Sequence, residues 1–402
     1  MRRPPPIVAI FLTVLLDMLS FSIVIPDVQI RVEALTHSHY PAAMAGILNG
    51  LTLAVFSIAQ FAVAPYLGQI SDRIGRRPVL LVTCAMSVLA AVLYAYAGSL
   101  PMIWLSRICL GIAAANMGVA QAYISDVTEP EARAKSMGML GMAFGIGFMF
   151  GPPLGAWLLD VGHGTPLALG WASAAFALVN LLFIVFALPE SKQQEPAQEN
   201  PKIGRLDAAM RAFSDPRLAP LLLLFFVANL AFSNLESTYY LVGKDVYHLS
   251  VKSTTLVLIV VGVVSAVMQG GVLRLLVPRF GELALVRTGY LLTGPSLFTV
   301  PLVQPWLPVI LGAVAIGIGS GMTGPSVLSL VSQAADKEVV GEVMGVTGSL
   351  GAVARIAGPV LANALYKLSP VFPYALAGTM MLVPLALAWR YRLPEPSESA
   401  AT

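Results

Sequence analysis

The sequence predicts an all-α membrane protein, because it carries too little charge for a water-facing surface and repeats long apolar runs from end to end. Of its 402 residues, 57% are hydrophobic and only 11% are charged, and the mean hydropathy is +0.79. A soluble domain carries about a quarter charged residues. The outer surface of this chain is therefore expected to face lipid.

Apolar runs long enough to cross about 30 Å of hydrocarbon as a helix recur twelve times. Continuous runs dominate over the two-residue alternation of barrel strands, so we expect helices. The first run is predicted to be a retained span rather than a signal peptide, because Asp17 interrupts it and no small-residue cleavage site follows. The predicted spans are 7–27, 43–67, 78–98, 101–124, 135–159, 166–188, 217–240, 253–277, 284–303, 305–331, 340–365 and 370–390.

The distribution of basic residues predicts that both termini are cytoplasmic. If the N-terminus is placed in the cytoplasm, 18 of the 24 Lys and Arg residues fall on that side. Arg107 and Arg355 lie inside spans, and the opposite side holds Arg31, Lys244, Lys252 and Lys367. We therefore expect a monomeric, multi-pass protein of the cell (inner) membrane.

The chain is expected to consist of two similar halves. A hydrophilic stretch from Pro189 to Asp215 divides the spans six and six, and a shift of 207 residues places Gly151-Pro152 on Gly358-Pro359. Such a repeat predicts two six-helix bundles related by pseudo-two-fold symmetry, with substrate bound between them near the midplane. The expected divisions are an N-terminal bundle at 1–188, a cytoplasmic linker at 189–216, and a C-terminal bundle with a short tail at 217–402.

The loop after the second span reads GQISDRIGRRP over residues 68–78. A short basic loop alone would satisfy the positive-inside rule, but the whole string is more specific. It resembles the signature loop of the major facilitator superfamily. The resemblance implies a fold of that type and a role in closing the cytoplasmic side, carried by Gly68, Asp72, Arg73, Gly75, Arg76 and Arg77.

Two further strings resemble motifs of the same family. A charged residue within a span either faces a polar interior or snorkels to an interface. Arg107, followed by Gly111, is similar to an Arg-x-x-x-Gly motif, which implies a role in proton coupling. The fifth span resembles the Gly-Pro element of the drug:proton antiporters. The resemblance implies a gating role for the matching residues Gly147, Gly151, Pro152 and Gly155.

Together these motifs resemble those of the twelve-span drug:proton antiporters, a group that includes the tetracycline exporters. The first span supports this assignment through Asp17 followed by Pro26. In the second half, the counterpart of the signature loop is degraded, with Pro278 and Arg279 where the acidic-Arg pair would fall. Some tetracycline exporters carry carboxylates in the third and ninth spans. This chain has none there, which argues against tetracycline itself as the substrate.

Asp17 and Glu236 are the acidic residues that fall clearly inside the predicted spans. A carboxylate held away from water takes up a proton more readily, which suits proton coupling. Glu236 shares a helical face with Asn229, Ser233 and Tyr240, and this face is a candidate substrate site. The alternatives are that Asp17 is a structural hydrogen-bond acceptor and that Glu236 lies at the outer membrane interface.

Arg355, in the eleventh span, either pairs with a carboxylate or binds an anionic group of the substrate. Its presence leaves the charge of the substrate open. Uncharged polar residues inside spans serve interhelical hydrogen bonds or line a cavity, and a flat substrate could stack on an aromatic ring. Asn116, Gln121 and Phe56 complete the candidate substrate site on these grounds.

We expect neither an enzyme nor an ATP-driven pump, because the sequence contains no nucleophile–base pair and no phosphate-binding loop. No cofactor, metal or nucleic acid is expected, and the two cysteines are predicted to be free. The predicted function is a proton-coupled antiporter that exports lipophilic or amphipathic small molecules by alternating access. The alternative is a symporter or facilitator for a sugar, an organic acid or another small metabolite.

Overall fold

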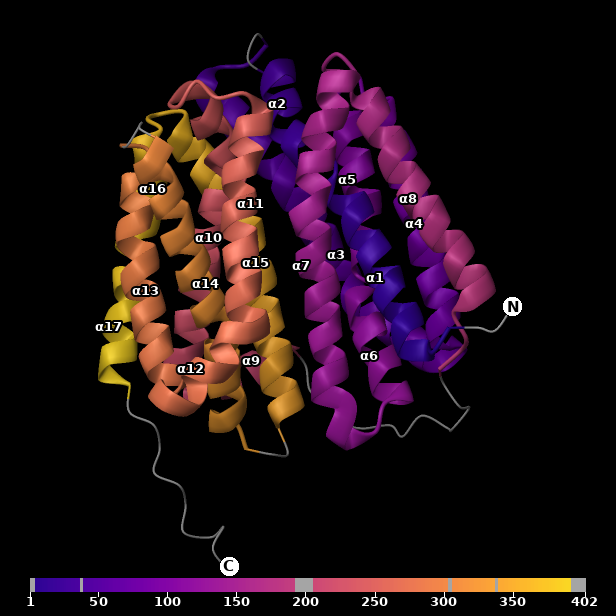
Figure 1. Ribbon diagram of the computed structural model, residues 1–402, viewed down its shortest axis with the longest axis vertical. Coiled ribbons are helices and arrows are strands. Elements are labelled where there is room, and N and C mark those ends of the chain that lie inside the picture. The colour runs from indigo at the N-terminus through magenta and orange to yellow at the C-terminus, as the bar shows by residue number, and fades with distance from the viewer. Residues whose placement is uncertain (1–3, 37–38, 192–204, 303–305, 337–338, 392–402) are drawn as a thin grey trace, which may run out of the picture. The chain divides into compact units, whose positions relative to one another are not determined.

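The computed structural model describes residues 4–36, 39–191, 205–302, 306–336 and 339–391, and every regular element in these ranges is a helix (Figure 1). The all-α prediction is confirmed for this part of the chain. The first half contains α1 Pro6–Ser22, α2 Ile25–Thr36, α3 Ala42–Ile74, α4 Arg76–Ala95, α5 Leu100–Ala114, α6 Met117–Val127, α7 Pro130–Val161 and α8 Pro166–Ala187. The second half contains α9 Arg205–Ser214, α10 Ala219–Asp245, α11 Val251–Val267, the π-helical turn η1 Met268–Val272, α12 Leu273–Phe280, α13 Glu282–Thr299, α14 Trp306–Ala334, α15 Val340–Tyr366, α16 Val371–Met380 and α17 Leu382–Arg390.

Within the described residues, 10 helical segments are long and apolar enough to cross a membrane. Several of these segments are interrupted: α1 is followed by α2 after Val24, α5 by α6 after Asn116, and η1 separates α11 from α12. The two remaining predicted spans, 135–159 and 284–303, fall mainly on α7 and α13. Each predicted span therefore coincides with helix in the described residues.

The first membrane segment is longer than predicted. The prediction ended at residue 27, but the helical segment continues to Thr36. Its second part, α2, carries Asp27, Arg31 and Glu33 among apolar residues. Asp27 and Arg31 lie one helical turn apart and form an ion pair of 2.8 Å, so each charge enters the segment with a partner. The predicted boundary was too early because it was placed where the unbroken apolar run ends, and the charged pair begins there.

The turn between the second and third spans of each half has a similar geometry. Gly75 joins α3 to α4 with φ 101°, and Gly281 joins α12 to α13 with φ 73°. The N–H of Gly75 donates to Ser71 O at 3.1 Å, and that of Gly281 donates to Val277 O at 2.9 Å. Positive φ favours glycine, which ends one helix and starts the next. The second half thus keeps this turn although its sequence lacks the acidic-Arg pair.

The described helices belong to two compact units whose boundaries differ from those of the sequence halves. The first unit comprises Met1–Glu199, Ser237–Val263 and Pro359–Pro370, and the second comprises Asn200–Glu236, Val264–Gly358 and Val371–Thr402. Two segments of the second half therefore pack with the first half. Because this grouping rests on contact rather than on repeat structure, the expected domain boundaries at 188 and 217 stay a prediction.

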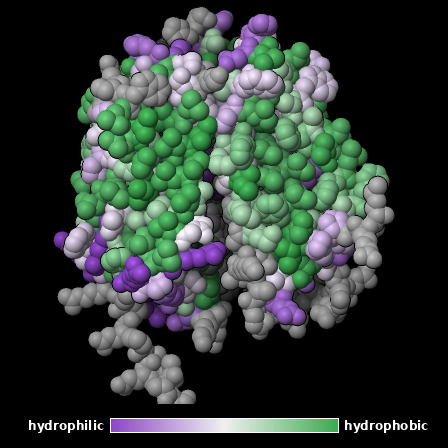
Figure 2. All heavy atoms as spheres, viewed as in Figure 1, coloured by the Kyte–Doolittle hydropathy of each residue, from purple (hydrophilic) through white to green (hydrophobic). Residues whose placement is uncertain are grey.

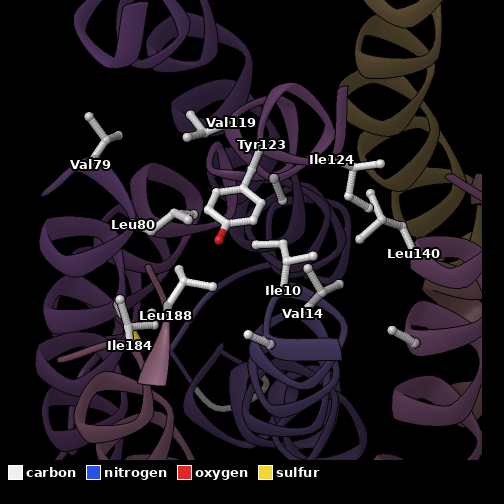
Figure 3. Close-up of a cluster of buried hydrophobic side chains, with 14 of the residues drawn as sticks. Ile10, Val14, Val79, Leu80, Val119, Tyr123, Ile124, Leu140, Ile184 and Leu188 are labelled. Carbon is white, nitrogen blue, oxygen red and sulfur yellow. The ribbon is translucent and has the colours of Figure 1, made fainter. Parts of the chain in front are cut away.

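A large cluster of buried hydrophobic residues in the first unit lies where α1, α4, α6, α7 and α8 meet (Figure 3). Figure 3 shows the ring of Tyr123 among Leu80, Ile10 and their neighbours, and its hydroxyl donates to Pro189 O at 3.0 Å. Hydrophobic side chains cover much of the face shown in Figure 2, and each unit has large hydrophobic side chains that are exposed. Since lipid is as apolar as these side chains, close packing and hydrogen bonds rather than burial from water hold such helices together. Asp17 follows Val14 of this core on α1.

Candidate functional site

Asp17 lies on α1 in the first unit, and only 7% of its surface is exposed. Its Oδ2 accepts a hydrogen bond from Asn116 Nδ2 at 3.1 Å, and its Oδ1 accepts a longer one from Ser87 Oγ at 3.4 Å. The structure therefore brings together two predicted site residues, Asp17 and Asn116, and adds Ser87. Both donors are uncharged, and no ion pair to Asp17 is found in the described part of the chain.

Asn116 reaches Asp17 because it stands at the break between α5 and α6. Its backbone N–H donates to Ala113 O at 3.1 Å, and the N–H of Ala115 donates to Ile112 O at 3.3 Å. These bonds span three residues rather than four and tighten the helix at this point. The side-chain amide of Asn116 does not cap α6, so it is available to the carboxylate on α1. The interruption of the fourth membrane segment thus builds part of the Asp17 site.

A second buried carboxylate, Asp27, lies on α2 of the same membrane segment, with 3% of its surface exposed. Arg31 donates to it from Nε at 2.8 Å and from Nη2 at 3.1 Å. The hydroxyl of Tyr94, on α4, donates to its Oδ2 at 2.7 Å. The sequence analysis missed Asp27 because the predicted span ended there. The opposite charges of Asp27 and Arg31, one helical turn apart, are the signal that could have found it.

Arg107, predicted to serve proton coupling, lies on α5 with 4% of its surface exposed. Its guanidinium carbon lies 5.5 Å from the centre of the Tyr94 ring, a cation–π distance. Its Nε and Nη2 are buried and have no hydrogen-bond partner among the described residues. Tyr94 connects Arg107 to Asp27, whereas no hydrogen bond or ion pair joins Arg107 to Asp17 in that part of the chain. Arg107 therefore belongs to the surroundings of Asp27.

Glu236, on α10, and Arg355, on α15, both lie in the second unit and interact electrostatically. Both side chains are exposed although they lie within apolar membrane segments. The guanidinium of Arg355 lies near Gly351, one turn earlier on its helix. Of the two predicted roles of Arg355, pairing with a carboxylate and binding an anion, this placement is compatible with both.

The other residues of the predicted α10 face make separate contacts. Asn229 Nδ2 donates to Phe225 O of its own helix at 2.8 Å. Ser233 is buried and packs against Gly358 of α15. Tyr240, in the first unit, is buried with its hydroxyl 3.3 Å from Thr255 Oγ1. Asn229, Ser233 and Tyr240 thus each contact a different partner.

Two predicted substrate residues of the first half lie away from the Asp17 hydrogen bonds. Gln121 is exposed on α6. Phe56 is half-buried on α3, and its ring centre lies 5.1 Å from that of Phe21 with the planes tilted by 33°. An exposed amide and a tilted aromatic pair are compatible with contact to a flat substrate, and with packing alone.

The signature loop centres on Arg76. Its Nη1 donates to Asp72 Oδ1 at 2.6 Å and to Ser71 Oγ at 2.7 Å, and its Nε donates to Asp126 Oδ2 at 3.0 Å. One arginine thus ties the loop to α3 and to the end of α6. Asp126 is a partner that the sequence analysis did not select.

The remaining loop residues have different surroundings. Arg77 donates to Ile184 O at 3.3 Å and Val185 O at 2.6 Å, which satisfies carbonyls at the end of α8. The side chain of Glu190 accepts from the N–H groups of Arg76 and Arg77 and would block a Cβ at Gly75. Arg73 is exposed, and a Cβ at Gly68 would meet no atom within 4 Å.

The glycine-rich face of α7 packs directly on α1. A Cβ at Gly147 would meet Met18, one at Gly151 would meet Ser22, and one at Gly155 would meet Ile23. Ser22 Oγ also donates to Gly147 O at 2.9 Å. Pro152 is buried within the same helix. This close contact is the small-residue packing expected from the spacing, and it fixes the end of α1 that follows Asp17.

An ion-pair cluster outside the membrane segments provides a contrast. Arg217 donates from Nη2 to Asp215 Oδ2 at 2.8 Å and to Asp336 Oδ2 at 3.3 Å. The hydrogen bond from Arg217 holds the pKa of Asp215 below its ordinary value. In this wet setting an arginine keeps a carboxylate charged.

Comparisons with known proteins agree on one family. The family model for the Major Facilitator Superfamily matches residues 10–359. The chain is 31% identical to human major facilitator superfamily domain-containing protein 10, over 92% of this chain and 89% of that protein. It is 30% identical to the class C tetracycline resistance protein of Escherichia coli, over 92% of this chain and 91% of that protein. The crystal structure of the human organic anion transporter MFSD10 (TETRAN) matches with a TM-score of 0.73 and 26% identity, covering 96% of this chain and 100% of that one.

Proposed function

This chain belongs to the major facilitator superfamily, and on that premise we propose that it is a proton-coupled antiporter that exports lipophilic or amphipathic small molecules. Membership makes it a multi-pass membrane protein and a secondary transporter rather than an enzyme. The predicted fold, two six-helix membrane bundles, is confirmed by the match to a solved transporter over 96% of the chain. Proton coupling, export and substrate class are the proposal.

The observation that carries the proposal is the setting of Asp17. An ionised carboxylate inside a membrane protein is costly unless it is paired or hydrogen-bonded. Asp17 has only neutral hydrogen-bond donors, Ser87 and Asn116, in the described part of the chain. A proton can therefore neutralise this carboxylate without leaving a buried cation unpaired. The two bonds stabilise the charged form, so both protonation states are supported.

Antiport follows if proton and substrate cannot both occupy the site. Binding of a substrate polar group to ionised Asp17 or Glu236 would release a proton, and protonation would release the substrate. Relatives described as tetracycline resistance proteins favour the export direction. In this account, residues of the signature loop and the glycine face of α7 gate the two sides by rocking of the bundles.

The charge of the substrate is a separate question. The exposed guanidinium of Arg355 is suited to a carboxylate or another anionic group, and Glu236 competes for it. The solved relative is described as an organic anion transporter. Both observations favour amphipathic organic anions among the substrates. They are also compatible with the alternative, a symporter or facilitator for an organic acid, a sugar or another metabolite.

The proposal includes a monomer in the cell (inner) membrane with both termini cytoplasmic, on the basis of the basic-residue count. Its partners are the small-molecule substrate, protons and the lipid bilayer.

The test is transport by the full chain in proteoliposomes with an imposed pH gradient. Fluorescent cationic, neutral and anionic amphipathic compounds are supplied outside, and protein-free vesicles correct for passive entry. Antiport predicts accumulation when the lumen is acidic, and symport predicts accumulation when the lumen is alkaline. Transport that is indifferent to both gradients would show facilitation and refute proton coupling.

A further inference from the structure

An ion pair at one end of the first unit joins the two halves of the sequence. Lys367 Nζ, just beyond α15, donates to Glu33 Oε1 on α2 at 2.6 Å. The two side chains are only 14% and 10% exposed. The sequence analysis placed Lys367 in a loop on the external side and assigned Glu33 no role. Both residues lie in the first unit, so this contact belongs to one compact body.

Close backbone contact accompanies the ion pair. A Cβ at Gly46 of α3 would lie 2.5 Å from Asn363 O, and a Cβ at Gly50 would lie 2.5 Å from Pro359 O. Real Cβ atoms do not approach oxygen so closely, so only glycine permits this approach of α3 to the end of α15. We call Gly46, Gly50 and the facing residues Pro359 and Asn363 the glycine seam.

We propose that Glu33 and Lys367, together with the glycine seam, form a latch that holds this end of the protein closed and must open once in each transport cycle. Alternating access requires the two repeats to separate at each end in turn. Glu33 and Gly46 belong to the first repeat, whereas Lys367 and Asn363 belong to the second. The latch therefore lies across the contact that has to part. This inference depends on alternating access and is independent of the proposed proton coupling and substrate.

The chemistry of the pair suits a reversible latch. Removal of one partner leaves the other charge in a poorly hydrated place, which favours opening to water. When the end opens, both side chains regain water, so the open state has no unpaired buried charge. Exchange of the two charges should preserve the latch, because attraction depends on opposite sign rather than on which side carries it.

A neighbouring hydrogen bond supplies a matched control. The hydroxyl of Tyr366 donates to Asp245 Oδ2 at 3.1 Å. Tyr366 directly precedes Lys367. Its partner Asp245 belongs to α10, so both residues of this hydrogen bond lie in the second half of the sequence. This bond does not cross between the repeats. Its loss should affect the local packing without releasing the latch.

The experiment measures how fast a buried reporter cysteine is modified. Ala362 is fully buried on the same turn of α15 as Asn363. The reporter Ala362→Cys is placed in the full chain with Cys84→Ala and Cys109→Ala, and the purified protein in detergent is treated with N-ethylmaleimide. Glu33→Gln and Lys367→Met are each expected to raise the modification rate about tenfold. The exchange Glu33→Lys with Lys367→Glu should return it close to the parent rate, and Tyr366→Phe should leave it unchanged.

A second variant tests the seam without touching a charge. Gly50→Val should raise the modification rate as well, because the added carbons force α3 from α15. Gly262→Val is its control, since a Cβ at Gly262 would meet no atom within 4 Å. The latch is overturned if the charge variants are modified no faster than Tyr366→Phe, or if the exchanged pair is as fast as the single variants. Should the charge variants fail to fold, a Gly50→Val rate equal to that of Gly262→Val overturns it.

Discussion

Asp17 and Asp27 lie ten residues apart on the same membrane segment, and both are buried, yet their partners differ in kind. Asp17 is held by an amide and a hydroxyl. Asp27 is held by the guanidinium of Arg31 and by Tyr94, whose ring also carries Arg107. Burial alone does not distinguish the two acids. The charge of the surrounding donors does.

This difference assigns them different tasks. Removal of the negative charge of Asp27 would leave the guanidinium groups of Arg31 and Arg107 without their anion, at a cost of several kcal/mol. Protonation of Asp17 removes a charge and leaves only neutral donors to rearrange. We infer that Asp17 exchanges protons during transport and that Asp27 is a structural anion. The glycine face of α7 holds the end of α1 between these two sites.

The largest expected effect is the loss of coupling in Asp17→Asn. Asparagine keeps the size and an acceptor oxygen, so the fold is retained, but it cannot take up a proton. Gradient-driven transport in proteoliposomes should fall to the rate of protein-free vesicles. Asp160→Asn, at an exposed carboxylate on α7, is the control and should transport like the parent. Full gradient-driven transport by Asp17→Asn would remove the distinction between the two acids.

The next effect is on stability, in Asp27→Asn. Loss of the anion leaves Arg31 and Arg107 uncompensated, at a cost of about 3 kcal/mol or more. The melting temperature of the purified protein in detergent should fall, and by more than in Asp17→Asn. The Asp27→Asn protein that does fold should still show transport driven by the pH gradient. An unchanged melting temperature would contradict the structural role.

A smaller effect is expected from the donors of Asp17. Asn116→Ala removes a hydrogen bond that stabilises the ionised carboxylate, so the pH of half-maximal transport should rise. Ser87→Ala should shift it less, because the Ser87 bond is longer, 3.4 Å against 3.1 Å. The pH profile of transport measures both. Equal shifts, or a shift in the opposite direction, would argue against this account of the site.

The smallest effect is expected for the solvent-exposed ion pair of Asp215 and Arg217. The lowered pKa of Asp215 means that the pair stabilises the fold at neutral pH and that this contribution disappears as the pH falls through that pKa. Arg217→Gln should lower the melting temperature only slightly at neutral pH, because water and salt screen an exposed ion pair. The difference from the parent should vanish in acid. A difference that persists in acid would show that Arg217 acts through something other than this charge pair.

The comparison also shows what the sequence could reveal. Apolar runs predicted the helical spans because lipid forces backbone groups to bond within helices. Asp17 was found because it interrupts such a run. Asp27 was missed because its ion pair with Arg31 allows the helix to continue past the point where apolarity stops. A pattern of residue types records where charges are, but not which partners neutralise them.

The surroundings of the other candidates depended on packing that spacing does not encode. Arg107 was predicted to serve proton coupling, and this role stays a prediction; the structure places Arg107 against Tyr94, near Asp27. Tyr240 shares a helical face with Glu236, yet its hydroxyl lies near Thr255 of α11. The meeting of Asp17 with Asn116 depends on the break between α5 and α6, for which the sequence carries no Gly or Pro at the break itself.

The most direct test of the central claim is infrared difference spectroscopy of the purified protein during a change in pH. The carbonyl band of a protonated carboxylic acid reports which acid takes up the proton. We predict that a component of this band disappears in Asp17→Asn and is retained in folded Asp27→Asn. A band that is unchanged in Asp17→Asn but lost in Asp27→Asn would contradict the account.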